Sequence, residues 1–131
     1  MTTLSNEKKH VLVIEDEEAT RRVFVEELTQ EGFTVSSAEN GGEGLKLALA
    51  RHPDLILLDI ILPVMDGLTV LKRLREDVWG KDAKVIVMTQ MGQHSAIKAS
   101  AEAMHPVAYF SKEGPSLDEI MRKAKEVLAS S

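Results

Sequence analysis

The chain has 131 residues, a length at which one domain buries about two thirds of the surface of its unfolded chain. It contains no cysteine, which excludes disulfides and thiolate metal sites, and its formal net charge of −5 gives no basic surface for direct nucleic-acid binding. Because it has no apolar run of about 18 residues and no signal peptide at its start, we predict a cytoplasmic protein without a membrane segment.

Five short apolar segments alternate along the chain with stretches of helical length. They lie at 11–14, 33–35, 55–58, 85–88 and 107–110. The first, third and fourth are continuous apolar runs, which is typical of strands that are covered on both faces. We therefore predict an α/β fold with a doubly wound, five-stranded parallel sheet, a flavodoxin-like (βα)5 arrangement and the strand order 2-1-3-4-5.

Apolar residues at spacings of three and four mark the helices between these strands. The first helix is predicted at about 18–31 with its end at Gly32, and the third begins at about Gly67. The fourth, at 96–104, is rich in alanine, so we expect it to pack shallowly. The last helix, from Leu117 onward, has the clearest apolar stripe.

In sheets of this kind, ligands bind at the carboxyl ends of the strands. The polar residues at those ends are Glu15 and Asp16 after the first strand, Asp59 after the third, Thr89 after the fourth and Lys112 after the fifth. The first and third strands are neighbours in the predicted order. We therefore expect the three acids to converge, with Thr89 and Lys112 on the other side of Asp59.

Three converging carboxylates repel one another, and a bound cation relieves this repulsion. Ligands that are all oxygen atoms, with room for water, suit Mg²⁺ better than calcium or zinc. Such a cation would also neutralise the charge on a phosphoryl group that meets Asp59 as its nucleophile. Lys112 and the Thr89 hydroxyl could then hold the remaining phosphoryl oxygens. Asp59 is therefore the candidate phosphoacceptor.

Taken together, these motifs resemble the receiver domain of two-component response regulators. The matching positions are Glu15-Asp16, Asp59 in LLDIILPVMDG, Thr89 in VIVMTQ, and Tyr109 with Lys112 in VAYFSK. The resemblance implies a single receiver domain over residues 1–131, with an ordered core at about 9–129. It also implies a signalling phosphoprotein that takes a phosphoryl group onto Asp59 from a histidine kinase or a histidine phosphotransfer protein, as in a phosphorelay.

The resemblance also assigns roles within the site. The metal ligands would be Asp16, Asp59, the backbone carbonyl of Ile61 and, directly or through water, Glu15. Thr89 would move toward the phosphoryl group, and Tyr109 would act with it as the switch that partners read. A downstream protein partner would bind the surface formed by the fourth helix, fifth strand and fifth helix of a monomer or weak dimer.

The same family pattern places two residues beside the water that would hydrolyse the phosphorylated aspartate. These are Ile61 and Met91, which lie two positions after Asp59 and Thr89. Neither side chain can orient water through a hydrogen bond, and both can cover its approach. We therefore expect slow self-dephosphorylation.

Two departures from the family pattern affect the site. Glu15 stands where the family more often has aspartate, but it keeps the charge. Glu113 follows Lys112 where the family usually has a cis-proline. A cis bond before a residue other than proline costs about 2.5 to 4 kcal/mol, so we expect a trans bond and a rerouted loop. The segment 99–106 lacks the usual glycine-containing turn, which predicts an unusual shape for the partner surface.

Simpler interpretations exist for several of these residues. Glu15 and Asp16 could favour the positive end of the first helix, and Thr89 could be an ordinary strand residue. Phe110 could fill the space assigned to Tyr109. The four histidines show no metal spacing and are predicted to be surface residues.

Other functions fit the sequence less well. In a flavodoxin the first turn must bind a phosphate, which the acids at 15–18 would repel. A haloacid-dehalogenase-like phosphatase needs a second acid where Ile61 stands. The alternative that remains is a receiver-fold interaction module that works without a phosphorylation cycle. Because the chain ends at Ser131, we expect a stand-alone regulator that is not an enzyme beyond its own phosphorylation and dephosphorylation.

Overall fold

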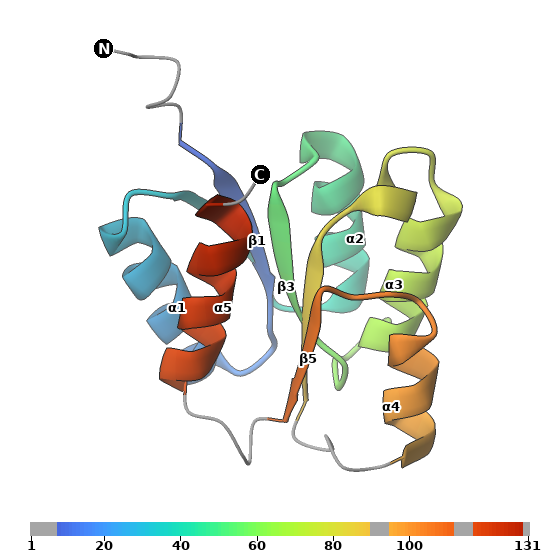
Figure 1. The fold of residues 1–131 in the computed structure, drawn as a ribbon. Coiled ribbons are helices and arrows are strands. Elements are labelled where there is room, and N and C mark those ends of the chain that lie inside the picture. Colours follow the sequence, from blue (N-terminus) through green and yellow to red (C-terminus); the bar gives the residue numbers. More distant parts are fainter. Residues whose placement is uncertain (1–7, 90–94, 112–116, 130–131) are drawn as a thin grey trace.

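Strands and helices alternate along the chain in the computed structural model, which describes residues 8–89, 95–111 and 117–129 (Figure 1). The elements are β1 (His10–Ile14), α1 (Glu18–Gln30), β2 (Thr34–Ala38), α2 (Gly41–Arg51), β3 (Leu55–Asp59), α3 (Gly67–Glu76), the 3-10 helix η2 (Gly80–Asp82), β4 (Val85–Thr89), α4 (Ser95–Glu102), β5 (Ala108–Ser111) and α5 (Leu117–Ala129). Within these described ranges, no helix is long and apolar enough to cross a membrane.

The five strands form one parallel sheet in the order β2-β1-β3-β4-β5, which confirms the predicted order. On β1, Val11 lies opposite Val35 of β2 on one side and Leu55 of β3 on the other. Because all the strands run in one direction, their carboxyl ends reach the same edge of the sheet, the lower edge in Figure 1. The residues that follow the strands are therefore brought together at that edge.

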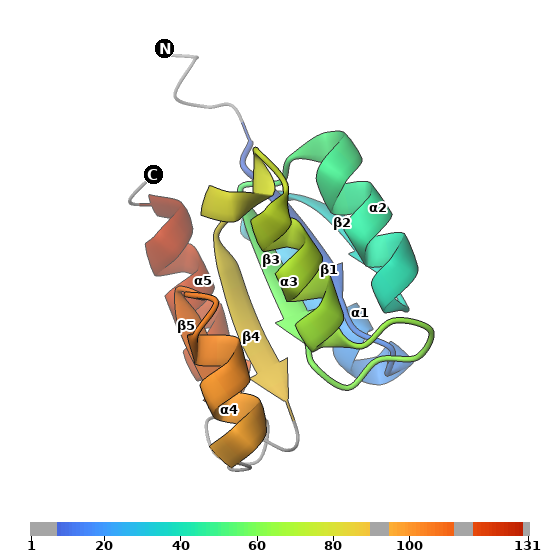
Figure 2. The ribbon, with the colours of Figure 1, turned by 90° about the vertical axis from the view of Figure 1, so that its right-hand side faces the viewer.

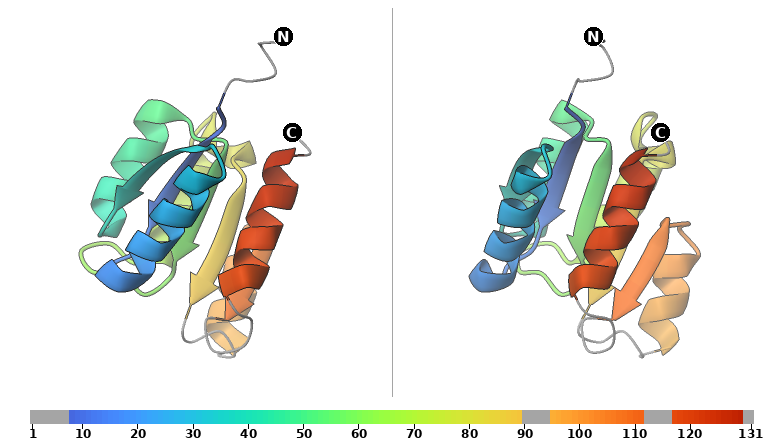
Figure 3. Two further views of the ribbon diagram at one scale, coloured as in Figure 1. Left: turned by 90° about the vertical axis from the view of Figure 1, so that its left-hand side faces the viewer. Right: turned by 60° about the vertical axis from the view of Figure 1, so that its left-hand side comes forward.

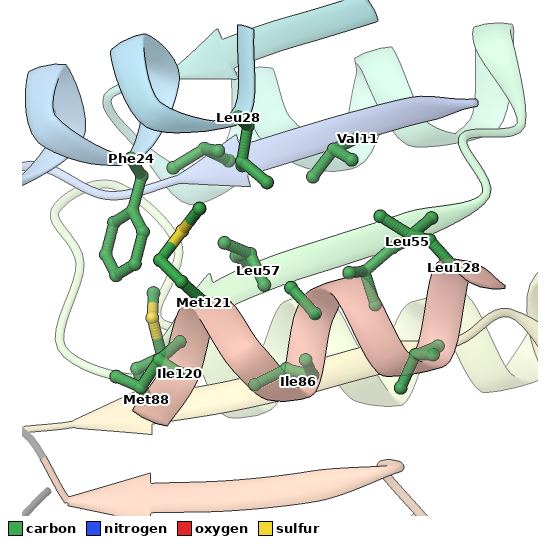
Figure 4. Close-up of a cluster of buried hydrophobic side chains, with 13 residues drawn as sticks. Val11, Phe24, Leu28, Leu55, Leu57, Ile86, Met88, Ile120, Met121 and Leu128 are labelled. Carbon is green, nitrogen blue, oxygen red and sulfur yellow. The ribbon is translucent and has the colours of Figure 1, made fainter. Parts of the chain in front are cut away.

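Helices cover both faces of the sheet, with α1 and α5 on one face and α2, α3 and α4 on the other (Figures 1 and 3). The cluster under α1 and α5 packs Phe24, Leu28 and Met121 against Leu57 of β3 and its neighbours (Figure 4). The cluster on the opposite face joins the alternate strand residues, such as Leu58, to α2 and α3. Both faces of β1, β3 and β4 are thus buried, which explains their continuous apolar runs.

The helix predictions hold for the strong and the weak case alike. The apolar stripe of α5 is buried, with Ile120, Met121 and Ala124 among its core residues. In contrast, the only buried residue in the described part of α4 is Ala101, so this helix does pack shallowly. At the end of α1, Gly32 adopts a φ of 99°, a left-handed conformation that glycine tolerates best.

The loop between β3 and α3 is held at both of its ends. At its far end Asp66 caps α3 by accepting a hydrogen bond from Thr69 N (3.0 Å). Gly67 N donates to the carbonyl of Ile60 at 2.7 Å, and a Cβ on Gly67 would lie only 2.3 Å from the carbonyl oxygen of Asp59. As predicted, this Asp-Gly pair makes the turn and starts the helix, and glycine is required for the close approach.

The middle of this loop is a tight turn around Val64. Met65 N donates to the carbonyl of Pro63 at 2.7 Å, the hydrogen bond of a γ-turn, and Val64 between them has a φ of 69°. A positive φ is strained for a β-branched residue, and the Val64 side chain is 86% exposed, so little burial compensates for it. The neighbouring structure must therefore hold the loop in this shape.

Arg75 ties the far end of α3 to the segment that leads into β5. Its guanidinium donates to the carbonyl oxygens of Gly80 (2.7 Å), Ala83 (2.9 Å), Met104 (2.8 Å) and His105 (3.3 Å). Burial lowers the pKa of Arg75, and the Asp82 carboxylate opposes this shift. One side chain thus holds the connection between α4 and β5 against the body of the fold.

Candidate functional site

The end of β1 supplies two acids in different surroundings. Glu15 is fully buried, and its Oε2 accepts a hydrogen bond from Glu17 N at 3.1 Å. Asp16 is exposed. Arg21, one turn into α1, donates from Nη1 to the carbonyl oxygens of Glu15 (2.9 Å) and Asp16 (3.3 Å). The backbone that presents the two acids is therefore fixed by a side chain of the following helix.

Asp59 is the last residue of β3 and is only 3% exposed. Its Oδ1 accepts a hydrogen bond from Ile61 N at 3.0 Å, and Ile60 N donates to Met88 O at 3.0 Å. The pairing with β4 thus continues one residue past the strand. These contacts hold the Asp59 carboxylate at the edge of the sheet.

The three acids converge as predicted. One carboxylate oxygen from each of Glu15, Asp16 and Asp59 lies within 4.8 Å of the others. This donor set contains only oxygen atoms and carries up to three negative charges, and one of its members is exposed to water. A hard cation that keeps part of its hydration shell, such as Mg²⁺, suits such a set. The residues present therefore fit the magnesium site that the sequence predicts.

Thr89 ends β4 and is fully buried. It pairs with Ser111 of β5, and Val87, two residues earlier on β4, pairs with Tyr109. Since alternate residues of a strand share a face, Thr89 and Tyr109 lie on the same side of the sheet. Phe110 packs instead with the cluster under α1 and α5. The interpretation that Phe110 fills the space of Tyr109 is therefore wrong.

Tyr109 is half-buried and packs against the cluster that faces α2 and α3. Its hydroxyl is buried and has no hydrogen-bond partner among the described residues. Burial raises the pKa of Tyr109, and the Glu102 carboxylate raises it further. A cavity of about 360 Å³ lies beside the ring, lined by Glu102, His105, Pro106, Val107, Ala108 and Tyr109 itself. The ring therefore has open space next to it on the surface between α4 and β5.

Several predicted features lie outside the described residues. These are Lys112, its bond to Glu113, Met91 and His94. Ile61 lies in the β3–α3 loop, where its side chain is 46% exposed. His10 differs from the prediction of a surface residue, because its ring is half-buried and its Nε2 lies 2.8 Å from Ser36 Oγ.

Sequence patterns did not indicate the residues that support the site. Arg21 occurs on an ordinary helix, and only the fold brings its guanidinium back to the carbonyls before that helix. Gly41 stands in an Asn-Gly-Gly sequence that is typical of a turn or a helix start, and it has no room for a Cβ because the carbonyl of Met65, more than 20 residues further along the chain, lies against it. No local signal reports such contacts.

The sequence of this chain is similar to known proteins. A family model described as the response regulator receiver domain matches residues 11–125. Sporulation initiation phosphotransferase F of Bacillus subtilis is 34% identical over 125 residues, which cover 95% of this chain and 96% of that protein. The transcriptional regulatory protein YkoG of the same organism is 49% identical over 70 residues, which cover 53% of this chain but 31% of YkoG. The chain thus matches a small part of the transcriptional regulator and nearly all of the phosphotransferase.

A solved structure agrees with these sequence matches. The response regulator protein TrrA of Thermotoga maritima, in complex with Mg²⁺–BeF, is 36% identical to this chain and superposes with a TM-score of 0.77. The match covers 91% of this chain and 98% of TrrA.

The convergence of the three acids predicts a charge effect on stability. In metal-free buffer, Asp59→Asn should raise the free energy of unfolding by on the order of 1 kcal/mol, because it removes like-charge repulsion that exists only in the folded state. The side-chain oxygen of the introduced asparagine can still accept the hydrogen bond from Ile61 N. Added Mg²⁺ should narrow the difference, since it stabilises the wild type more. Urea unfolding with and without magnesium measures both effects.

The matched control for this comparison is Asp66→Asn. It removes a charge from the same loop but from outside the acid cluster, and asparagine caps a helix as well as aspartate does. Its stability should change little and should not respond to magnesium differently from the wild type. An Asp59→Asn protein less stable than the wild type without metal would contradict the repulsion.

The burial of Tyr109 predicts that its hydroxyl ionises at a higher pH than that of an ordinary tyrosine. Tyr109 is the only tyrosine of the chain, so the tyrosinate absorbance reports this group alone. We expect its midpoint in the folded protein above the ordinary value of 10.0, and Glu102→Gln should lower it part of the way back. Above pH of about 10 the unfolded tyrosine ionises first, so this group reduces stability as the pH rises. A folded midpoint at or below that of the urea-unfolded chain would contradict the burial.

Proposed function

The chain belongs to the response regulator receiver domain family and is a phosphoacceptor of two-component signalling, and on that premise we propose that Asp59 is the residue that it phosphorylates. The observation that carries this proposal is the convergence of the three carboxylates within 4.8 Å, with Asp59 buried at the end of β3. A buried carboxylate among other acids is unfavourable unless the site binds positive charge. A phosphoryl group that arrives with a cation would meet this requirement.

In the proposed reaction, an Asp59 carboxylate oxygen attacks the phosphorus of a phosphohistidine on the partner. The new bond is P–O, the broken bond is P–N, and the released imidazole nitrogen takes a proton from water. Bound Mg²⁺ would neutralise charge on the phosphoryl oxygens. We assign its ligands to Asp16, Asp59, the Ile61 backbone carbonyl and, directly or through water, Glu15. The TrrA complex with Mg²⁺–BeF supports magnesium as the metal but does not identify these ligands.

The remaining oxygens of the phosphoryl group need a positively charged group or hydrogen-bond donors beside them. We assign these roles to Lys112 and to the hydroxyl of Thr89. Thr89 is the last residue of β4, the strand that pairs with the end of β3 at Asp59. Thr89 and Tyr109 lie on one face of the sheet, and the ring of Tyr109 has open space beside it. This arrangement supports the proposal that a shift of Thr89 changes the position of Tyr109.

Receiver domains exchange phosphoryl groups with histidine kinases or phosphotransfer proteins, and we propose such a donor for this chain in the cytoplasm. The proposed output is a protein partner on the surface of α4, β5 and α5, bound by a monomer or weak dimer. We further propose that residues 1–131 form one receiver domain, which is supported by one sheet from His10 to Ser111 and a last helix that ends at Ala129. The alternative, an interaction module without phosphorylation, does not explain why three carboxylates converge at this edge of the sheet.

The decisive experiment is phosphorylation by acetyl phosphate in the presence of Mg²⁺. We expect intact-mass measurement to show one added phosphoryl group, and peptide mapping to place it on Asp59. Chelation of the metal should prevent the modification, because the acids alone would repel the phosphoryl oxygens. Asp59→Asn should prevent it as well.

Asp66→Asn serves as the control for phosphorylation, because it makes the same substitution in the same loop at a residue that caps a helix. It should be phosphorylated like the wild type. Modification that persists in Asp59→Asn, or that needs no metal, would sink the assignment of Asp59.

The lifetime of the phosphorylated state gives a further prediction. Ile61 and Met91 offer no group to orient a hydrolytic water, so we propose slow self-dephosphorylation. Ile61→Asn together with Met91→Glu should speed the loss of phosphate by about tenfold or more, which corresponds to a barrier lower by about 1.4 kcal/mol. The decay is followed by intact mass after removal of acetyl phosphate.

Val64→Asn is the matched control for this experiment. It introduces the same amide into the same loop at a residue that is 86% exposed. Its decay should match the wild type. If the double variant decays no faster than the wild type, or if Val64→Asn accelerates the decay equally, apolar cover over the aspartate is not what limits hydrolysis.

A further inference from the structure

The first residue of α2 touches the loop that follows Asp59. Gly41 is buried, and a Cβ on it would lie 1.8 Å from Met65 O, 2.8 Å from Met65 C and 2.9 Å from Val70 Cγ2. These distances are impossible for real atoms, so only a glycine permits this contact. Figure 2 shows the loop between β3 and α3 passing below the end of α2 at which the helix begins.

Backbone conformation does not explain a glycine at this position. Among the described residues, Gly32 is the only glycine with a positive φ, so Gly41 has a conformation open to any residue. Alanine would also form the helix more readily than glycine. Space for the carbonyl of Met65 is therefore the reason for the glycine.

Any atom added at Gly41 must displace either α2 or the loop. The first turn of α2 is anchored by the Asn40 cap, whose Oδ1 accepts from Glu43 N at 2.8 Å, and by Leu45 in the core. The loop is the weaker side, since it runs through exposed residues and contains the strained turn at Val64. The loop would therefore move.

A shift at Met65 reaches the site because the loop is short and closed. Gly67 N donates to Ile60 O at 2.7 Å, and Ile61 N donates to Asp59 Oδ1 at 3.0 Å. Besides the contact with Gly41, this segment is held by Leu62 and Met65, which are only partly buried where they pack against the core. A change in its shape must therefore alter the position of Ile61 against the Asp59 carboxylate.

We propose that Gly41 is a positioning residue of the phosphorylation site. By its lack of a side chain it lets α2 hold the β3–α3 loop in the shape that sets the Ile61 backbone against the acid cluster. This inference rests on the proposed function, in which that backbone and those acids bind Mg²⁺. Gly41 acts through the loop and touches neither the metal nor the phosphoryl group.

The test compares three alanine variants of neighbouring glycines in one helix. Gly41→Ala clashes with the loop. Gly42→Ala meets only ordinary contacts, 3.5 Å from Asn40 Oδ1 and 3.6 Å from Val64 Cγ1. Gly44→Ala clashes with the core instead, 2.5 Å from Ile14 Cδ1. The three proteins therefore separate an effect on the loop from helix propensity and from general destabilisation.

Two readouts are needed, and neither is the phosphorylation rate. Amide hydrogen exchange in metal-free protein reports the loop, and a magnesium titration followed by NMR gives the dissociation constant. In Gly41→Ala we expect faster exchange at Ile61, Met65 and Gly67 and a dissociation constant for Mg²⁺ that is raised about tenfold, as for other residues that orient metal ligands. Gly42→Ala and Gly44→Ala should keep both within about twofold of the wild type, although Gly44→Ala should unfold at lower urea.

Each outcome decides the inference. Unchanged exchange and unchanged magnesium affinity in Gly41→Ala would overturn it, and so would an equal loss of affinity in Gly44→Ala. Failure of Gly41→Ala alone to fold would also overturn it, because the loop would then not be the part that yields. If the wild type binds no magnesium, the proposed function fails, and the exchange rates still decide whether Gly41 holds the loop.

Discussion

Three carboxylates are held together at one edge of the sheet, and the apolar core beneath them keeps them there. With carboxylate oxygens within 4.8 Å, each ionised pair opposes folding by on the order of 1 kcal/mol or more after screening by water. The opposing force comes from strands that are buried on both faces. Because β1 and β3 are neighbours and parallel, burying their apolar residues also fixes their final acids side by side. The packing of the core thus imposes the repulsion, and a bound cation would relieve it.

The loops around this edge are fixed by contacts that reach back from the helices. Arg21 returns to the carbonyls that precede its own helix, and Gly67 brings the start of α3 against the backbone of Asp59. Gly41 does the same for the far side of the β3–α3 loop. The acids therefore sit on short, supported segments, as a site with defined ligand positions requires.

The sequence predicted the strands and their order because their signals are local and strong. Continuous apolar runs marked the buried strands, and the strand order then placed Glu15, Asp16 and Asp59 together. The sequence prediction fails at two residues for identifiable reasons. Phe110 cannot substitute for Tyr109, because the two-residue period of a strand puts neighbours on opposite faces. The pairing of His10 with Ser36 joins two strands and leaves no trace in either segment alone. Contacts of this kind, like those of Gly41, join segments far apart in the sequence, and the periodicity of one segment does not encode them.

The hydrogen bonds of Arg75 hold one end of the surface between α4 and β5 in place. The guanidinium grips the carbonyls of Met104 and His105, where the chain turns from α4 into β5, and that turn lies at the end of the sheet away from the acids. Between this grip and the site lies α4, which is barely packed into the core. The α4–β5 surface therefore has one end tied to the body of the fold at Met104 and His105, while the described part of α4 adds little buried area to hold the rest of the helix.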